Sequence, residues 1–285
     1  KELRKKRKWY VRVLRFMLFS FLAFILFLFL ININFLWLFG SSPRISDIKN
    51  PQQSIASEVY SSDGKMLGRF YRENRTPVEY SELSPLLVKT LVATEDERFY
   101  SHSGIDFVGL FSAFKDWFSG EYRGASTISQ QLIKNMYKTR SAYSKGLCGH
   151  IPFVRVIIMK LKEWIGAFKI EMYYTKEEVL AMYLNTVDFG NNTFGIKTAS
   201  RVYFQTTPKD LKPEQIAMLI GMLKAPTTYN PLKNPKNCTK RRNVILNIMQ
   251  NHKLISKNEC DSLLALSLGL KYKVEDVSDG EAPYF

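Results

Sequence analysis

The chain has 285 residues, of which 46% are hydrophobic, and a formal net charge of +15 at pH 7. This length allows a substantial core and predicts one domain of about 200 residues with appendages. The spacing of Cys148, Cys238 and Cys260 excludes a disulfide framework and a cysteine metal site. No nucleic-acid motif accompanies the positive charge, so we expect no nucleic-acid partner; anionic lipids or a pyrophosphate-bearing substrate account for it equally well.

The N-terminus predicts a membrane anchor. Residues 1–15 form a basic tail, and residues 16–39 are apolar apart from Ser20, Asn32 and Asn34. A span needs roughly twenty apolar residues, and basic residues before it favour a cytoplasmic N-terminus. We therefore interpret residues 16–39 as an uncleaved transmembrane signal anchor; a buried core helix is the alternative.

Residues 40–79 are polar and predict a linker. An Asp63-Gly64 turn lies between β-prone residues from Glu58 to Phe70. This pattern is typical of a β-hairpin, which we expect between the anchor and the main body.

A helical run, Leu86 to Ala93, precedes the stretch from Glu95 to Gly104, where adjacent carboxylates stand beside aromatic residues and a histidine. Apolar neighbours raise the pKa of a carboxylate, which is what a general acid or base needs. The alternative is the end of a helix with ordinary salt bridges. In the next segment, Phe107 to Phe118, apolar residues occupy too many positions around a helix for burial on one side alone. Such a segment fits either a membrane interface or core packing.

A second helix is predicted to begin at Thr127, which has capping-box spacing to Gln130. Thr127, Gln131 and Lys134 then share one face. The free N–H groups of the helix start, with Lys134 further along, could hold an anion such as a phosphate.

A third helical block places Glu163, Ala167 and Glu171 on one face, with Lys160 one turn earlier. Two-carboxylate chemistry at a sugar would need a partner such as Glu163 for Glu95, although an exposed surface pair would show the same pattern. Thr175 and Glu178 predict the capped start of the following helix.

Taken in order, these blocks resemble the motifs of the peptidoglycan glycosyltransferase family, found alone or at the N-terminus of class A penicillin-binding proteins. The matching patterns are Glu95-Asp96-x-x-Phe99-x-x-His102-x-Gly104, Gly124-x-Ser126-Thr127-Ile128-x-Gln130-Gln131-Leu132-x-Lys134-Asn135, Lys160-x-x-Glu163 with Tyr183-Leu184-Asn185, Gly190-x-x-x-Phe194-Gly195, and Leu223-Lys224-Ala225-Pro226. The sequence departs from the family at Met159, where an arginine is common; Arg155 and Lys162 are the candidates to replace it.

The resemblance implies a mainly α, lysozyme-like bilobal glycosyltransferase domain at residues 80–255, with the N-terminal transmembrane helix and the short β-hairpin before it. Residues 256–285 would form a linker to a transpeptidase domain; a monofunctional enzyme is the alternative. The protein would lie in the bacterial cytoplasmic membrane as a single-pass protein, with the catalytic domain on the extracytoplasmic face.

The implied reaction is polymerisation of lipid II into β-1,4 glycan strands with inversion at the anomeric carbon. Glu95 would be the general base, and Glu163 would act at the donor pyrophosphate, where a divalent cation, magnesium or manganese, could bind; no organic cofactor is expected. The substrate-binding residues implied by the motifs are Asp96, Phe99, His102, Ser126, Thr127, Gln130, Gln131, Lys134, Asn135, Lys160 and Glu171. His102 would orient the first motif, and Glu171 could be only the structural partner of a lysine.

Lipid II, the growing glycan strand, the membrane and a cell-wall synthesis complex are the expected partners. A lysozyme-like hydrolase or lytic transglycosylase, or a non-catalytic membrane scaffold, are the rival interpretations.

Overall fold

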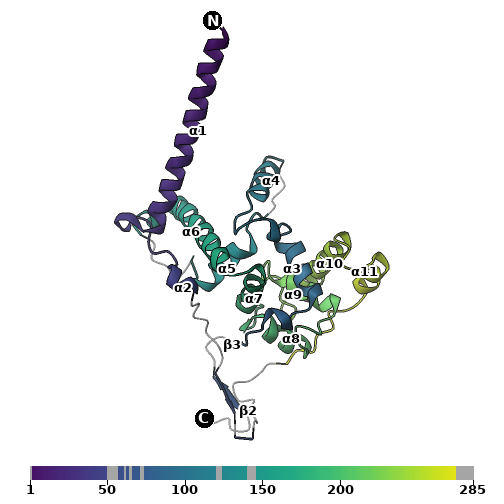
Figure 1. Cartoon of the computed structure of the whole chain (residues 1–285). Coiled ribbons are helices and arrows are strands. Elements are labelled where there is room, and N and C mark those ends of the chain that lie inside the picture. The colour runs from purple at the N-terminus through teal and green to yellow at the C-terminus, as the bar shows by residue number, and fades with distance from the viewer. Residues whose placement is uncertain are drawn as a thin grey trace.

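The computed structural model describes residues 2–49, 57–60, 62–63, 66–70, 74–119, 124–139 and 146–273. These residues are mostly helical, and a long N-terminal helix projects from a compact body (Figure 1). The mainly helical prediction, with an apolar N-terminal helix and a short hairpin, is confirmed.

The N-terminal helix α1 runs from Glu2 to Asn32. Its stretch Trp9–Asn32 has a mean hydropathy of 2.6, and among the described residues it is the one helix long and apolar enough to cross a membrane. The helix ends earlier than the predicted segment 16–39. After it, Asn34 adopts a left-handed backbone (φ 51°), a short 3-10 helix η1 follows at Phe35–Trp37, and Phe39 is buried against the body.

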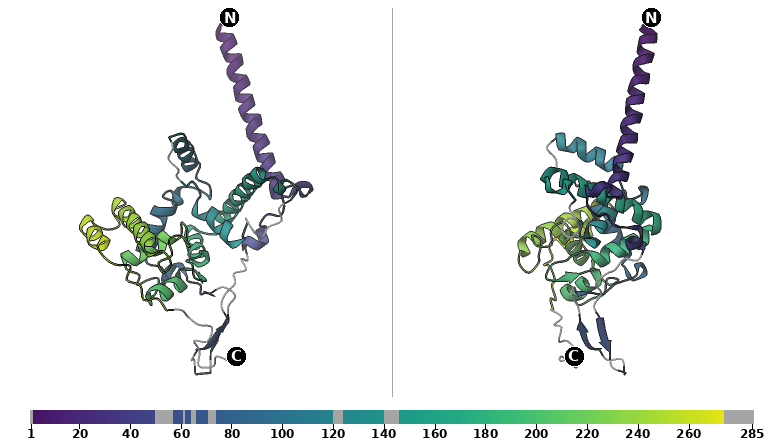
Figure 2. Two further views of the ribbon diagram at one scale, coloured as in Figure 1. Left: turned by 180° about the vertical axis from the view of Figure 1, so that it is seen from behind. Right: turned by 90° about the vertical axis from the view of Figure 1, so that its left-hand side faces the viewer.

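The hairpin forms from β1 (Ser57–Tyr60) and β2 (Met66–Phe70), which pair antiparallel. Its position differs from the expectation that it separates the anchor from the body. The views in Figures 1 and 2 place it on the side of the body opposite α1. The anchor instead packs directly on the long helix α6 (Pro152–Tyr173), which also contacts α2 (Ile45–Lys49).

The remaining elements surround one main core. They are, in chain order, β3 (Asn74–Arg75), η2 (Tyr80–Glu82), α3 (Pro85–Glu95), η3 (Phe99–Ser101), α4 (Phe107–Phe118), α5 (Ile128–Met136), η4 (Cys148–His150), α7 (Lys176–Thr186), β4 (Thr193–Phe194), α8 (Ile196–Phe204), α9 (Pro213–Met222), α10 (Pro235–Asn251) and α11 (Lys257–Leu264). Strands β3 and β4 pair in parallel. The main core lies among α3, α5 and α7 to α10, and a smaller apolar cluster joins α1 to α6 through Ile31, Phe39, Ile158 and Leu161.

The exposure of helix α4 distinguishes between the two interpretations of its apolar residues, a membrane interface and core packing. Phe107, Val108, Phe111 and Phe114 are all more than half exposed, which contradicts burial in the core. The helix lies on the side of the body from which α1 leaves (Figure 2). An exposed apolar helix on the same side as a helix long and apolar enough to cross a membrane fits an interfacial location.

The boundary expected at residue 255 falls inside the packed body. Helix α11 packs on α10, and the strand-like segment after it donates backbone N–H groups from Lys271 to Tyr203 and from Lys273 to Val202. Side chains such as Leu268 and Tyr272 cover the main core. Residues 274–285 of the predicted linker lie outside the described residues.

Candidate active site

Glu95 is the last residue of α3, because the backbone of Asp96 leaves the helical region (φ −160°, ψ 73°). This position presents the Glu95 carboxylate at the end of a rigid helix whose apolar residues are buried in the main core. Its Oε2 accepts a hydrogen bond from Nε2 of Gln131 on α5, at 2.9 Å. Gln131, which the motifs place among the substrate-binding residues, therefore contacts the Glu95 carboxylate directly.

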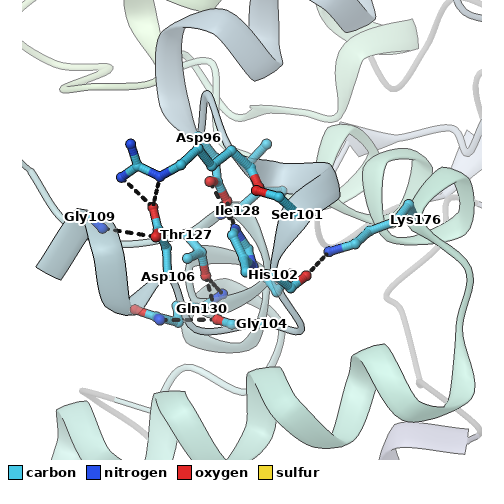
Figure 3. A network of polar contacts seen from close by, with 12 residues as sticks. Asp96, Ser101, His102, Gly104, Asp106, Gly109, Thr127, Ile128, Gln130 and Lys176 are labelled. Atoms are coloured by element: carbon cyan, nitrogen blue, oxygen red, sulfur yellow. Dashed lines mark hydrogen bonds and ion pairs between the residues drawn. The ribbon is translucent and has the colours of Figure 1, made fainter.

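Within the first motif, Glu95 to Gly104, Asp96 and His102 contact each other below the surface (Figure 3). His102 Nε2 lies 3.0 Å from Asp96 Oδ1, and Asp96 Oδ2 accepts the backbone N–H of Ile128 at 2.9 Å. Ile128 is the first residue of α5, so the Asp96 carboxylate occupies the helix start that we expected to hold a phosphate. The N–H groups of Ile128 and Gln130 are already bonded within the protein, to Asp96 and Thr127, and an anion site at the rest of the helix start stays a prediction.

Thr127 and Gln130 tie α5 to the end of the first motif. The Thr127 hydroxyl accepts the N–H of Gln130, as the capping pattern predicts, and donates to the carbonyl of Gly104 at 2.8 Å. The Gln130 side chain does not close the capping box; its Nε2 donates to the same carbonyl at 3.1 Å. Figure 3 shows these bonds converging on Gly104. Thr127 and Gln130 are almost fully buried, so we assign them to holding the loop.

Lys160 is the centre of a second polar cluster, on α6. Its Nζ donates to Ser126 Oγ and Gln130 Oε1, both at 2.8 Å, and lies 3.2 Å from Glu163 Oε2. Glu163 is only 1% exposed, and a carboxylate is buried at such depth at tolerable cost when a cation and hydrogen-bond donors accompany it. The exposed-pair alternative for Glu163 is therefore contradicted.

Glu171 belongs to a third cluster and pairs with a lysine. It accepts hydrogen bonds from Ser129 and from Lys176, whose Nζ also donates to the carbonyl of His102 at 2.6 Å. The Lys176 ammonium lies 4.2 Å from the centre of the Phe99 ring. Phe99 is fully buried, so its ring packs beneath the first motif.

Two predicted residues lie on the last turns of α5. Lys134 and Asn135 are partly buried there, one turn beyond Gln131. Lys162, a candidate to replace the missing arginine of the third motif, points elsewhere. Its Nζ donates to the carbonyl of Ser41 after the anchor, at 2.8 Å, and burial lowers its pKa to about 8.

Sequence reasoning assigned no role to Tyr183 or Lys176, which both join the site. Tyr183 lies fully buried on α7, and its hydroxyl donates to Gln131 Oε1 at 3.1 Å. The available signal was chemical: a tyrosine within a predicted helix of the domain needs a hydrogen-bond partner for its hydroxyl once it is buried. Which partner it takes depends on packing that the sequence does not display.

The described residues contain no group of three or more histidine, cysteine, aspartate or glutamate side chains that could hold a metal ion. Glu163 contributes one carboxylate, which lies 3.2 Å from the Lys160 ammonium. These side chains alone do not make a metal centre, so we derive no step through a cation. The cation at Glu163 stays a prediction, which would require most of its ligands to come from substrate or water.

Known proteins share this sequence pattern. The model of the transglycosylase family matches residues 63–250. The chain is 34% identical over 244 residues to penicillin-binding protein 1A of Escherichia coli, covering 85% of this chain and 27% of that protein. It is 33% identical over 283 residues to penicillin-binding protein 1F of Bacillus subtilis, covering 99% of this chain and 36% of that protein.

A crystal structure of penicillin-binding protein 1A from Haemophilus influenzae aligns with a TM-score of 0.44 and 22% identity, over 78% of this chain and 22% of that one. The chain thus spans only about a quarter to a third of the length of these relatives. The family model covers more than half of the chain, including every block from Glu95 to Tyr183. The chain belongs to the transglycosylase family, the peptidoglycan glycosyltransferases that its motifs resemble.

Proposed function

We propose that the chain polymerises lipid II into β-1,4-linked glycan strands of peptidoglycan. The observation that carries the proposal is the pair of glutamates on two helices that both contact α5: Glu95 bonded to Gln131, and Glu163 paired with Lys160 beside Gln130. Two carboxylates in different surroundings are what glycosyl-transfer chemistry uses for two different roles. Membership of the transglycosylase family supports the same reaction.

Glu95 would act as the general base. Its carboxylate takes the proton from the acceptor sugar hydroxyl while the oxygen attacks the anomeric carbon of the donor chain. A new C–O bond forms on one face as the bond to pyrophosphate breaks on the other, so the configuration inverts once. Gln131 keeps the carboxylate at the end of α3 during the transfer.

The Lys160 cluster would receive the leaving group. The electron pair of the broken bond passes to the polyprenyl pyrophosphate, whose negative charge needs fixed cations nearby. Lys160 is held by Ser126, Gln130 and Glu163, which makes its ammonium a preorganised charge. Lys134 on α5 would add a second positive charge.

Substrate would arrive from the membrane. A cavity of about 890 Å³ lies between α1, α6 and the loop that follows η3. Its apolar wall includes Ile25, Phe29 and Phe168. The cavity is also lined by His102 and Ser103, which belong to the first motif. The lipid of the substrate would use this cavity, and the exposed face of α4 would rest in the interface.

The orientation of the chain in the membrane follows from the positive charges near its N-terminus. The basic residues that precede the apolar part of α1 favour a cytoplasmic N-terminus, which puts the body on the extracytoplasmic face of the bacterial cytoplasmic membrane. We propose the growing glycan strand and a cell-wall synthesis complex as its partners there.

The test is polymerisation of purified lipid II by the detergent-solubilised chain, with products separated by length. The parent should make long lysozyme-sensitive strands and Glu95→Gln none. The matched control is Glu82→Gln, because Glu82 is an exposed glutamate that contacts Lys197 at 3.4 Å and the backbone N–H of Glu79 at 2.8 Å, which a glutamine oxygen can still accept; this variant should behave as the parent. Intact lipid II with shortening of preformed glycan would replace the proposal by a hydrolase or lytic transglycosylase, and no change in either substrate would favour a scaffold.

A further inference from the structure

Tyr183, Gln131 and Glu95 form a continuous chain of hydrogen bonds across three helices. The Tyr183 hydroxyl on α7 donates to Gln131 Oε1 at 3.1 Å. The other end of the same amide, Nε2, donates to Glu95 Oε2 at 2.9 Å. Tyr183 is 1% exposed and packs in the main core, so its hydroxyl is held on a rigid element.

The chemistry of the Gln131 amide fixes which group donates and which accepts in each of these two hydrogen bonds. Glutamine has one accepting and one donating end of nearly equal shape, and an ionised carboxylate only accepts. A hydroxyl donor at Oε1 leaves Nε2 to face Glu95. Burial, and secondarily the charge of Glu95, raises the pKa of Tyr183 well above its ordinary value of 10.0, so the hydroxyl retains its proton at neutral pH.

We propose that Tyr183 is a positioning residue, which fixes the carboxylate of Glu95 by holding the far end of the Gln131 amide. The proposal rests on the proposed function of Glu95 as the base. Without the hydroxyl, Gln131 Oε1 loses its partner, and the side chain is free to rotate away from Glu95. The carboxylate then samples orientations in which it cannot reach the acceptor hydroxyl.

The variant Tyr183→Phe keeps the ring and removes only the hydroxyl. We expect kcat for lipid II polymerisation to fall by about tenfold with KM unchanged, the size expected when a buried amide oxygen loses its only side-chain donor in this chain of bonds. The matched control is Tyr203→Phe. Tyr203 is also fully buried. Its hydroxyl donates to the carbonyl of Phe189 at 2.8 Å and accepts from Asn191 Nδ2 at 3.1 Å, so this control also loses buried hydroxyl contacts, but outside the site. Its kcat should equal that of the parent.

A double-mutant cycle separates action through Gln131 from any other effect of Tyr183. In a Gln131→Ala background, adding Tyr183→Phe should change kcat by less than about twofold, because the intermediary is already gone. Equal losses in both backgrounds would overturn the relay. So would a Tyr183→Phe variant whose kcat matches that of Tyr203→Phe.

A readout that needs no catalysis keeps this inference distinct from the proposed function. The side-chain amide protons of Gln131, followed by ¹⁵N NMR, should exchange with solvent faster in Tyr183→Phe than in the parent or in Tyr203→Phe. Faster exchange would support the relay even if the parent failed to polymerise lipid II, which would remove only the proposed function. Unchanged exchange would overturn the relay even in an active enzyme.

Discussion

Gly104 is the position at which a single methyl group should do most damage to the site. Its backbone has φ +83°, which L side chains rarely adopt, and an added Cβ would lie 2.6 Å from the carbonyl carbon and oxygen of Ala167. Both atoms belong to the backbone of α6 and cannot move without displacing that helix. The left-handed backbone costs about 1–2 kcal/mol and the overpacking about 1–3 kcal/mol, so Gly104→Ala should lose roughly 2–5 kcal/mol.

The loss can be measured as thermal unfolding of the detergent-solubilised chain by circular dichroism. For a protein of this size each kcal/mol lowers Tm by about 2–4 °C, so we expect a fall on the order of 10 °C. Gly124→Ala is the matched control, because no atom lies within 4 Å of the added Cβ. Its stability should change by less than about 0.5 kcal/mol. If the two variants melted within about 2 °C of each other, the close approach of Gly104 to α6 would be refuted.

Two further substitutions test buried charges in other parts of the body. Burial lowers the pKa of Lys162 to about 8 from 10.5, so above pH 8 the unfolded chain binds more protons than the folded one and the free energy of unfolding rises with pH. Lys162→Met should remove about 1 kcal/mol of this rise between about pH 7 and 9, measured by chemical unfolding. If the free energy of unfolding rose equally with pH in the parent and the variant, this reasoning would be contradicted. Arg242→Met should cost about 3 kcal/mol, since the 1% exposed guanidinium donates to the carbonyls of Leu266 and Ser267 at 2.8 and 2.9 Å. The exposed Lys240→Met is its control, and unfolding curves that coincide would show that these bonds contribute nothing.

Local features were predictable because the residues that determine each of them lie within a short stretch of the sequence. The caps at Thr127 and Thr175, the hairpin of β1 and β2, and the apolar run of α1 all follow from spacing in the sequence. The ends of these segments were less predictable. The anchor helix ends at Asn32, although the next residues are largely apolar, and the chain turns through the left-handed Asn34 to bring Phe39 against α6.

The residue types of the candidate site also came from the sequence, since motif spacing selects them. Their division of labour did not. Asp96 turned out to fill the start of α5. For Glu171 the sequence left open a structural pairing with a lysine, and the structure identifies that lysine as Lys176. Lys162 lies next to Glu163 in sequence but faces the anchor, because successive residues of a helix point in different directions.

By itself the sequence determined an apolar anchor, a mainly helical body and the set of polar residues that can perform glycosyl transfer. Only the tertiary structure decided which of them meet. The bonds from Ile128 to Asp96, from Lys160 to Ser126 and from Tyr183 to Gln131 join residues 32, 34 and 52 positions apart. Such contacts depend on how α5 packs against α6 and α7, and on the burial that makes each polar group take a partner, and neither is encoded in local spacing.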